Sequence, residues 1–137
     1  MTDQTTRLVL PSHIEAVAEA AAAVASFAQG CGVGDEAAFG IDVAVREAVT
    51  NAIVHANKGD ETKSIEVSFN CAGRALEIDV RDQGEGFDPA SVPDPTAPAN
   101  LLKTSGRGIF LIRNFMDEVH WSSRPEGGTT LHLVKRF

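Results

Sequence analysis

Three short segments of the chain carry acidic, amide and glycine residues at spacings that can do chemistry. They are Glu47-Ala48-Val49-Thr50-Asn51, Asp82-Gln83-Gly84-Glu85-Gly86-Phe87 and Gly106-Arg107-Gly108-Ile109. A carboxylate and an amide one helical turn apart can handle a proton and a metal ion, and glycine-rich turns let backbone N–H groups approach phosphate oxygens. Each segment alone is weak evidence, but together they indicate a nucleotide site.

The first segment places a carboxylate and an amide on one stripe of a predicted helix. Glu47 and Asn51 are four residues apart, so their Cβ atoms lie roughly 6 Å from each other, and His55 continues the stripe. An amide oxygen suits Mg²⁺, and a carboxylate can accept a proton from an attacking hydroxyl. Alone, this spacing is more typical of a solvated polar stripe, and a histidine near a helix C-terminus more often complements the helix dipole.

The second segment begins where a predicted strand ends. Asp82 can accept a hydrogen bond from a base amino group, while Gly84 and Gly86 leave room for the ring and the sugar. The alternative is a plain turn in which the Asp side chain bonds its own backbone.

The third segment places two glycines directly before a predicted helix. Free N–H groups and the positive end of the helix dipole would then face whatever lies beside Gly106 and Gly108. Phosphate is the natural occupant, and Lys103 and Arg107 flank the site. The segment is neither a Walker loop nor a Rossmann fingerprint, because the spacing of both motifs is absent.

The remaining pattern predicts the elements that position these segments. Capping signals predict helices over 12–29, with Ser12 and Glu15 as a capping box, and over 35–57, with Asp35 as N-cap. Alternation of apolar residues predicts a strand over 5–10 and hairpins over 64–80 and 119–134, and an apolar run predicts a helix over 108–116. The proline-rich stretch 88–105 is predicted to be a long loop. This order favours an α/β (α+β) two-layer sandwich, with a mostly antiparallel mixed sheet and helices on one face.

Composition indicates one ordinary globular domain over 1–137. Of the 137 residues, 43% are hydrophobic and 23% are charged. The formal net charge of -7 argues against direct binding to nucleic acid or to an anionic membrane, which both need a basic surface. The alanine-rich run 16–28 is interrupted by Glu19 and Ser26, so we expect neither a signal peptide nor a membrane span, and a cytoplasmic location.

The two cysteines, Cys31 and Cys71, have no metal-binding spacing. We expect them to be free thiols that act as small buried hydrophobic residues in a reducing compartment.

Taken together, the motifs resemble those of the bacterial anti-sigma factor serine/threonine-protein kinases, small members of the ATPase superfamily that includes gyrase, a chaperone and the histidine kinases. The matching motifs are Glu47-Ala-Val-Thr-Asn51-Ala-Ile-Val-His55, Arg81-Asp82-x-Gly84-x-Gly86, Ser105-Gly106-x-Gly108, Asn114-Phe-Met-Asp117-x-Val119 and Gly128-Thr129-Thr130. The likeness covers nearly the whole chain and implies a Bergerat-type ATP-binding fold with ATP and Mg²⁺ as cofactors.

The resemblance also implies roles for individual residues. Glu47 would be the catalytic base, Asn51 the Mg²⁺ ligand, and Asp82 the partner of the adenine amino group, with 88–105 as an ATP lid. The other implied ATP-binding residues are Gly84, Gly86, Lys103, Ser105, Gly106, Arg107, Gly108, Ile109, Thr129 and Thr130, of which Thr129 or Thr130 would support Asp82.

Family members phosphorylate a serine of an anti-anti-sigma (STAS-type) partner and, in another complex, sequester a sigma factor; other switched targets occur. The resemblance therefore implies these partners and a homodimer. One alternative is a nucleotide-gated binding module that switches partners without efficient phosphotransfer, although mere binding needs no base such as Glu47. Another is a detached histidine-kinase-like ATPase domain, but no dimerisation helix pair precedes the predicted domain in this sequence.

Overall fold

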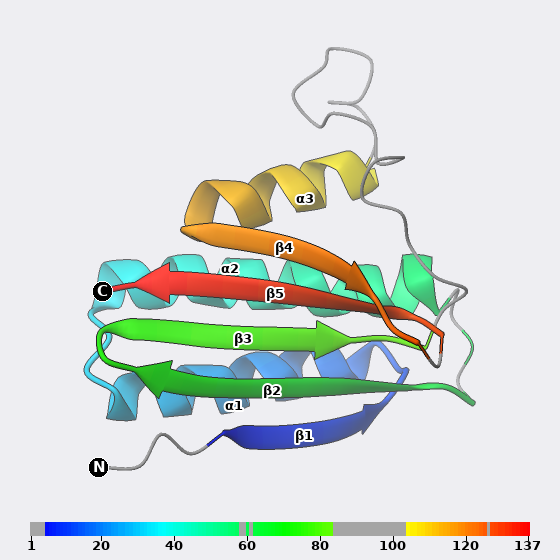
Figure 1. Cartoon of the computed structure of the whole chain (residues 1–137), viewed down its shortest axis with the longest axis horizontal. Helices are drawn as coiled ribbons and strands as arrows, with labels where there is room; N and C mark the ends of the chain where they lie inside the picture. The colour runs from blue at the N-terminus through cyan, green and yellow to red at the C-terminus, as the bar shows by residue number, and fades with distance from the viewer. Residues whose placement is uncertain (1–4, 58–59, 61, 84–103, 126) are drawn as a thin grey trace.

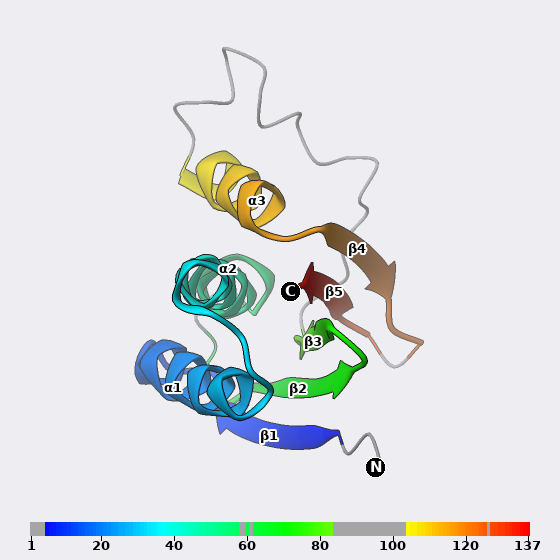
Figure 2. The ribbon, with the colours of Figure 1, turned by 90° about the vertical axis from the view of Figure 1, so that its left-hand side faces the viewer.

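A computed structural model describes the chain except for residues 1–4, 58–59, 61, 84–103 and 126. The elements in chain order are β1 (Thr6–Pro11), α1 (Glu15–Gly30), α2 (Asp35–Asn51), the π-helix η1 (Ala52–Ala56), β2 (Ser64–Ala72), β3 (Ala75–Arg81), α3 (Thr104–Phe115), β4 (Glu118–Ser123) and β5 (Thr129–Arg136). The strands form one layer and the helices lie on one side of it (Figures 1 and 2). The predicted two-layer sandwich is therefore confirmed.

The sheet has five strands in the order β1-β2-β3-β5-β4. Every strand pair in the described part of the chain is antiparallel. Strands β2 and β3 form a hairpin in which Val67 pairs with Val80, and β3 pairs with β5 so that Arg81 lies opposite Thr130. This register brings the end of β3 beside the start of β5, which is where two of the predicted motifs lie.

The core lies between the sheet and the helices. Alternate residues of β2, β3 and β5 point toward the helices, as the period of two predicts. Small residues on the inner faces of α1 and α2 allow the two layers to approach closely. The buried side chains include Ala16, Ala20, Val24, Ile41, Ala44, Val45, Ala48, Val49, Ile65, Val67, Phe69, Leu76, Ile78, Val80, Ile112, Leu131 and Leu133.

The starts of the first two helices differ from the capping predictions. The N-cap of α1 is Ile14, which makes no side-chain capping bond, and the N-cap of α2 is Gly34, so that Asp35 is the first helical residue. The hydroxyl of Ser12 instead accepts a hydrogen bond from the buried side chain of Asn57. The prediction of a capping box at Ser12 was wrong, because the helix begins only at Glu15 with Ile14 as its N-cap.

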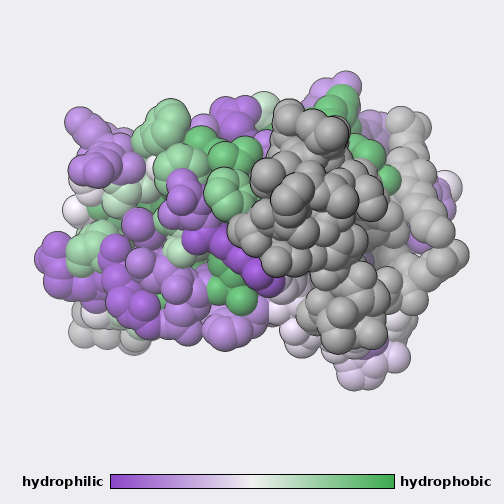
Figure 3. Space-filling view, turned by 90° about the horizontal axis from the view of Figure 1, so that it is seen from above, coloured by the Kyte–Doolittle hydropathy of each residue, from purple (hydrophilic) through white to green (hydrophobic). Residues whose placement is uncertain are grey.

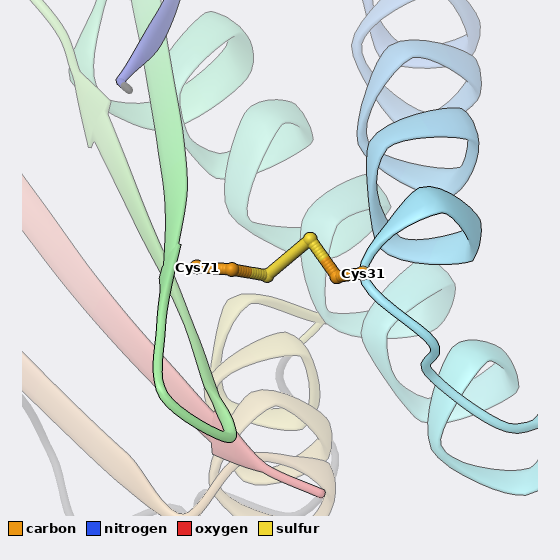
Figure 4. Close-up of a disulfide and its surroundings, with 2 residues drawn as sticks. All are labelled: Cys31 and Cys71. Carbon is orange, nitrogen blue, oxygen red and sulfur yellow. A yellow bond between two sulfur atoms is a disulfide. The ribbon is translucent and has the colours of Figure 1, made fainter. Parts of the chain in front are cut away.

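Cys31 and Cys71 form a disulfide, so the prediction of free thiols was wrong. Figure 4 shows the bond between the segment after α1 and the end of β2. The Cα atoms are 6.7 Å apart, although 40 residues separate the two cysteines in the sequence. The packing of α1 on the sheet brings them together, and sequence spacing alone carries no signal of such a contact.

Seen from above, the surface around α3 interleaves apolar and polar groups (Figure 3). The large apolar side chains exposed to solvent include Phe39 of α2 and Phe110 of α3. Among the described residues, no helix is both long and apolar enough to cross a membrane.

Candidate nucleotide-binding site

The C-terminal half of α2 carries the predicted carboxylate and amide. Glu47 and Asn51 are half-buried on one stripe, while Ala48 and Val49 pack into the core. Asn51 is the last residue of α2, and η1 follows without a break. The backbone of His55, which was predicted to continue this stripe, lies in the π-helix η1 and not in α2.

The backbone of α3 passes directly over this pair at Gly108. A Cβ added at Gly108 would lie 2.9 Å from Oε2 of Glu47, 3.4 Å from Nδ2 of Asn51 and 3.5 Å from Oδ1 of Asn51. A distance below 3.0 Å is closer than real Cβ atoms come, so any larger residue at this position would displace the Glu47 side chain. The structure thus joins the first and third predicted segments.

The third segment lies within a helix and not before one. Helix α3 begins at Thr104 in the described part of the chain, four residues before the predicted start at Gly108. Ser105, Gly106 and Arg107 belong to its first turn, where N–H groups have no partner within the helix, and Ile109 is buried. Glycine is a poor helix former, but tertiary packing overrides that preference where two helices approach closely.

At the end of β3, Asp82 is held against the start of β5. Its carboxylate Oδ1 accepts a hydrogen bond from the backbone N–H of Thr129 at 3.0 Å. Its own N–H donates to the carbonyl oxygen of Thr129, also at 3.0 Å. Asp82 is 7% exposed. This pair brings the second predicted segment together with the Gly128-Thr129-Thr130 motif.

The backbone of Thr129 bonds Asp82, and Thr130 lies on the other face of the sheet. Successive strand residues point to opposite faces of the sheet, and Thr130 lies on the face without helices, beside Arg81 and Ser68 in a hollow of about 530 Å³. The hydroxyl oxygen of Thr129 is buried and has no hydrogen-bond partner in the described part of the chain. A buried polar atom without a partner is costly, and it commonly marks the place of a water molecule or a ligand.

Two further residues hold the Asp82 peptide, and both were missed from the sequence. Arg124 donates from Nη1 to the carbonyl oxygen of Asp82 at 2.7 Å. Asn57 accepts from the N–H of Gln83 at 2.9 Å. Gly128, with φ of +98°, lies so close that an added Cβ would be 3.1 Å from Cα of Gln83. No local pattern predicts these contacts, because the partners come from distant parts of the chain.

The structure leaves part of the predicted site outside the described residues. Gly84, Gly86 and Lys103 belong to that part, as does most of the predicted lid 88–105. Within the ranges that the structure does describe, no three His, Cys, Asp or Glu residues cluster so that they could hold a metal ion.

The two-layer sandwich places a helix-borne carboxylate and amide against a glycine of the next helix. The chain belongs to the family of histidine kinase-like ATPase domains, whose family model matches residues 10–135.

Relatives with assigned names support a narrower grouping. The chain is 35% identical over 101 residues to an anti-sigma F factor of Anoxybacillus flavithermus, and the aligned region covers 71% of this chain and 68% of the relative. It is 34% identical over 118 residues to the serine-protein kinase RsbW of Listeria innocua, and the aligned region covers 82% of this chain and 75% of the relative. The predicted resemblance to anti-sigma factor serine kinases is confirmed.

Solved structures share the fold. The RsbU and RsbW domains of Rv1364c from Mycobacterium tuberculosis superpose with a TM-score of 0.71 at 21% identity, covering 97% of this chain and 32% of that one. The histidine kinase domain of a blue-light activated kinase from Erythrobacter litoralis superposes with a TM-score of 0.57 at 19% identity, covering 92% of this chain and 61% of that one. At these identities the likeness concerns the fold alone.

Proposed function

We propose that this chain is an ATP-dependent protein serine kinase and an anti-sigma regulatory factor. The contact of Gly108 with Glu47 and Asn51 carries the proposal, because it brings a base, an amide and the start of α3 to one place. The names of the relatives, an anti-sigma F factor and a serine-protein kinase, support the same function.

The described residues fit the base of ATP. Asp82 would accept a hydrogen bond from the adenine amino group, and the nearby Thr129 hydroxyl, which is buried without a partner, would bond the base directly or through water. An adenine there would satisfy a polar atom that is otherwise costly to bury. Gly84, Gly86, Lys103, Ser105, Gly106 and Arg107 would complete the site.

The residues of α2 would serve the phosphate end. Asn51 would hold Mg²⁺ through Oδ1, with phosphate oxygens and waters as the other ligands, a set that Mg²⁺ commonly accepts. Glu47 would accept the proton of a serine hydroxyl on the partner while the serine oxygen bonds to the γ-phosphorus. The bond from the γ-phosphorus to the bridging oxygen breaks, and ADP leaves.

The partners would be a STAS-type anti-anti-sigma protein as the substrate and a sigma factor or another switched protein as the alternative partner. A phosphate adds about two negative charges to the substrate. Because this chain has a net charge of -7, repulsion would favour release of the phosphorylated partner. We propose that the chain acts in this way as a homodimer, without direct binding to nucleic acid or membrane.

The test is transfer of labelled γ-phosphate from Mg-ATP to a co-purified STAS-type partner. Glu47→Gln keeps the size of the side chain and removes the base, and Asn51→Ala removes the metal ligand. Glu36→Ala, an exposed carboxylate on the first turn of the same helix, is the matched control. We expect labelled serine with wild type and Glu36→Ala, and none with the other two variants. ATP binding without any labelling would instead identify a nucleotide-gated binding module.

A further inference from the structure

Asn57 is a buried polar residue at a junction of distant segments. Its side chain is 0% exposed. Its Oδ1 accepts from the backbone N–H of Gln83 at 2.9 Å, and its Nδ2 donates to Oγ of Ser12 at 3.1 Å and to the carbonyl oxygen of Ser64 at 3.3 Å. Because a backbone N–H is one partner and a carbonyl is another, the orientation of the amide is set by its neighbours.

The π-helix explains how Asn57 reaches this junction. The N–H of Asn57 donates to the carbonyl oxygen of Ala52, five residues earlier, at 2.8 Å. In a straight α-helix, Asn57 would share the partly exposed face of Thr50, because seven residues make nearly two turns. The wider turn of η1 rotates the residues that follow it, so the side chain of Asn57 enters the interior beside the end of β3.

Asn57 holds one side of the peptide that follows the predicted base-binding residue. The N–H of Gln83 is bound to Asn57, and the carbonyl oxygen of Asp82 on the same peptide is bound to Arg124. The Asp82 carboxylate is bound to the N–H of Thr129. The position of the carboxylate is therefore constrained from the helix side as well as from β5.

A single amide thus ties the two ends of the candidate site together. The helix that carries Glu47 and Asn51 continues through η1 to Asn57, and Asn57 binds the segment that carries Asp82. The distance between the phosphate end and the base end of a nucleotide is fixed by its covalent structure. A protein that binds both ends gains affinity when their separation is set in advance.

We propose that Asn57 is a positioning residue that sets Asp82 for recognition of adenine. The inference rests on the proposed function, since it assigns a role in ATP selectivity to a residue that does not touch the nucleotide. The hydrogen bond from the N–H of Gln83 to Oδ1 of Asn57 carries this role, and the bonds from Nδ2 to Ser12 and Ser64 only hold the amide in place.

The test compares the affinities for ATP and GTP by titration calorimetry with the full chain. Asn57→Ala removes the acceptor for the N–H of Gln83. We expect ATP affinity to fall by about tenfold and the preference for ATP over GTP to fall by about threefold or more. These effects correspond to the loss of one buried hydrogen bond. Asn57→Asp keeps an acceptor, so we expect it to keep the preference. Ser12→Ala is the matched control, because it removes a bond of the same amide on the side away from Gln83.

A purely structural role would give a different result. Asn57→Ala and Ser12→Ala would then both lower the melting temperature and leave the preference for ATP unchanged, which would overturn the proposal. If Asn57→Ala does not fold, Asn57→Ser carries the same test, since the shorter side chain does not reach Gln83. If wild type binds no ATP, the proposed function itself fails; if wild type binds ATP and the alanine variant keeps its selectivity, only the role of Asn57 fails.

Discussion

Gly108 of α3 lies so close to Glu47 of α2 that a Cβ on the glycine would be 2.9 Å from Oε2 of the glutamate. The atom it would meet is the far end of a flexible side chain, so Glu47 can move away at little cost in stability. The residue that moves is the predicted catalytic base. Packing of two helices and placement of the base therefore depend on the same glycine.

We expect Gly108→Ala to lower phosphotransfer by more than about tenfold, since a misplaced base loses most of the 10²–10⁴-fold effect of general-base catalysis. The melting temperature should change little. Gly30→Ala is the control, because nothing lies within 4 Å of a Cβ at Gly30. Equal activity of the two variants would show that Gly108 does not position Glu47. Transfer of labelled phosphate and differential scanning calorimetry provide the two measurements.

Thr129→Val should weaken ATP binding by about tenfold without loss of stability. Valine has nearly the same shape, and it removes a buried hydroxyl that has no partner in the described part of the chain. The free energy of unfolding of the variant should therefore equal or slightly exceed that of wild type. Thr130→Val serves as control on the opposite face of the sheet. The dissociation constant for ATP, measured by calorimetry, checks this prediction. Similar constants for wild type and Thr129→Val would contradict a role of the hydroxyl in binding the base.

Gly128→Ala should destabilise the fold by more than Gly73→Ala. Both glycines have positive φ, +98° and +63°, where an L side chain costs about 1–2 kcal/mol. A Cβ at Gly73 meets nothing within 4 Å, while one at Gly128 meets the backbone of Asp82. We expect a difference of about 1–3 kcal/mol between the two variants, as is typical of overpacking. Urea unfolding measures it, and equal free energies of unfolding would contradict the close approach.

Reduction of the Cys31–Cys71 disulfide should lower the free energy of unfolding by roughly 2–4 kcal/mol, because the cross-link restricts the unfolded chain over 40 residues. Calorimetric scans with and without a thiol reductant measure the effect. The double variant Cys31→Ser with Cys71→Ser is the control and should not respond to the reductant. ATP affinity should stay the same, since Cys71 pairs with Leu76 near the turn of the β2–β3 hairpin, whereas Asp82 follows Arg81 at the other end of that hairpin. A melting temperature that is the same with and without the reductant would show that the two thiols are not joined in solution.

Local pattern was enough to predict the elements and their order. The alternation in β2 and β3, where Val67 and Val80 face the core, follows from the period of two in a strand. The stripe of Glu47 and Asn51 likewise follows from the helical period. These features depend only on residues close together in the chain, so the local sequence contains all the information needed to predict them. Most helix boundaries were predicted within a few residues for the same reason.

The contacts that assemble the site come from packing across the chain. Gly108 meets Glu47, Thr129 meets Asp82, and Cys31 meets Cys71 only because the helices lie on one face of the sheet and β3 pairs with β5. The register pairs Arg81 with Thr130, so Asp82 comes next to the backbone of Thr129. Distances between residues far apart in sequence depend on how the layers pack, and local periodicity carries no information about them.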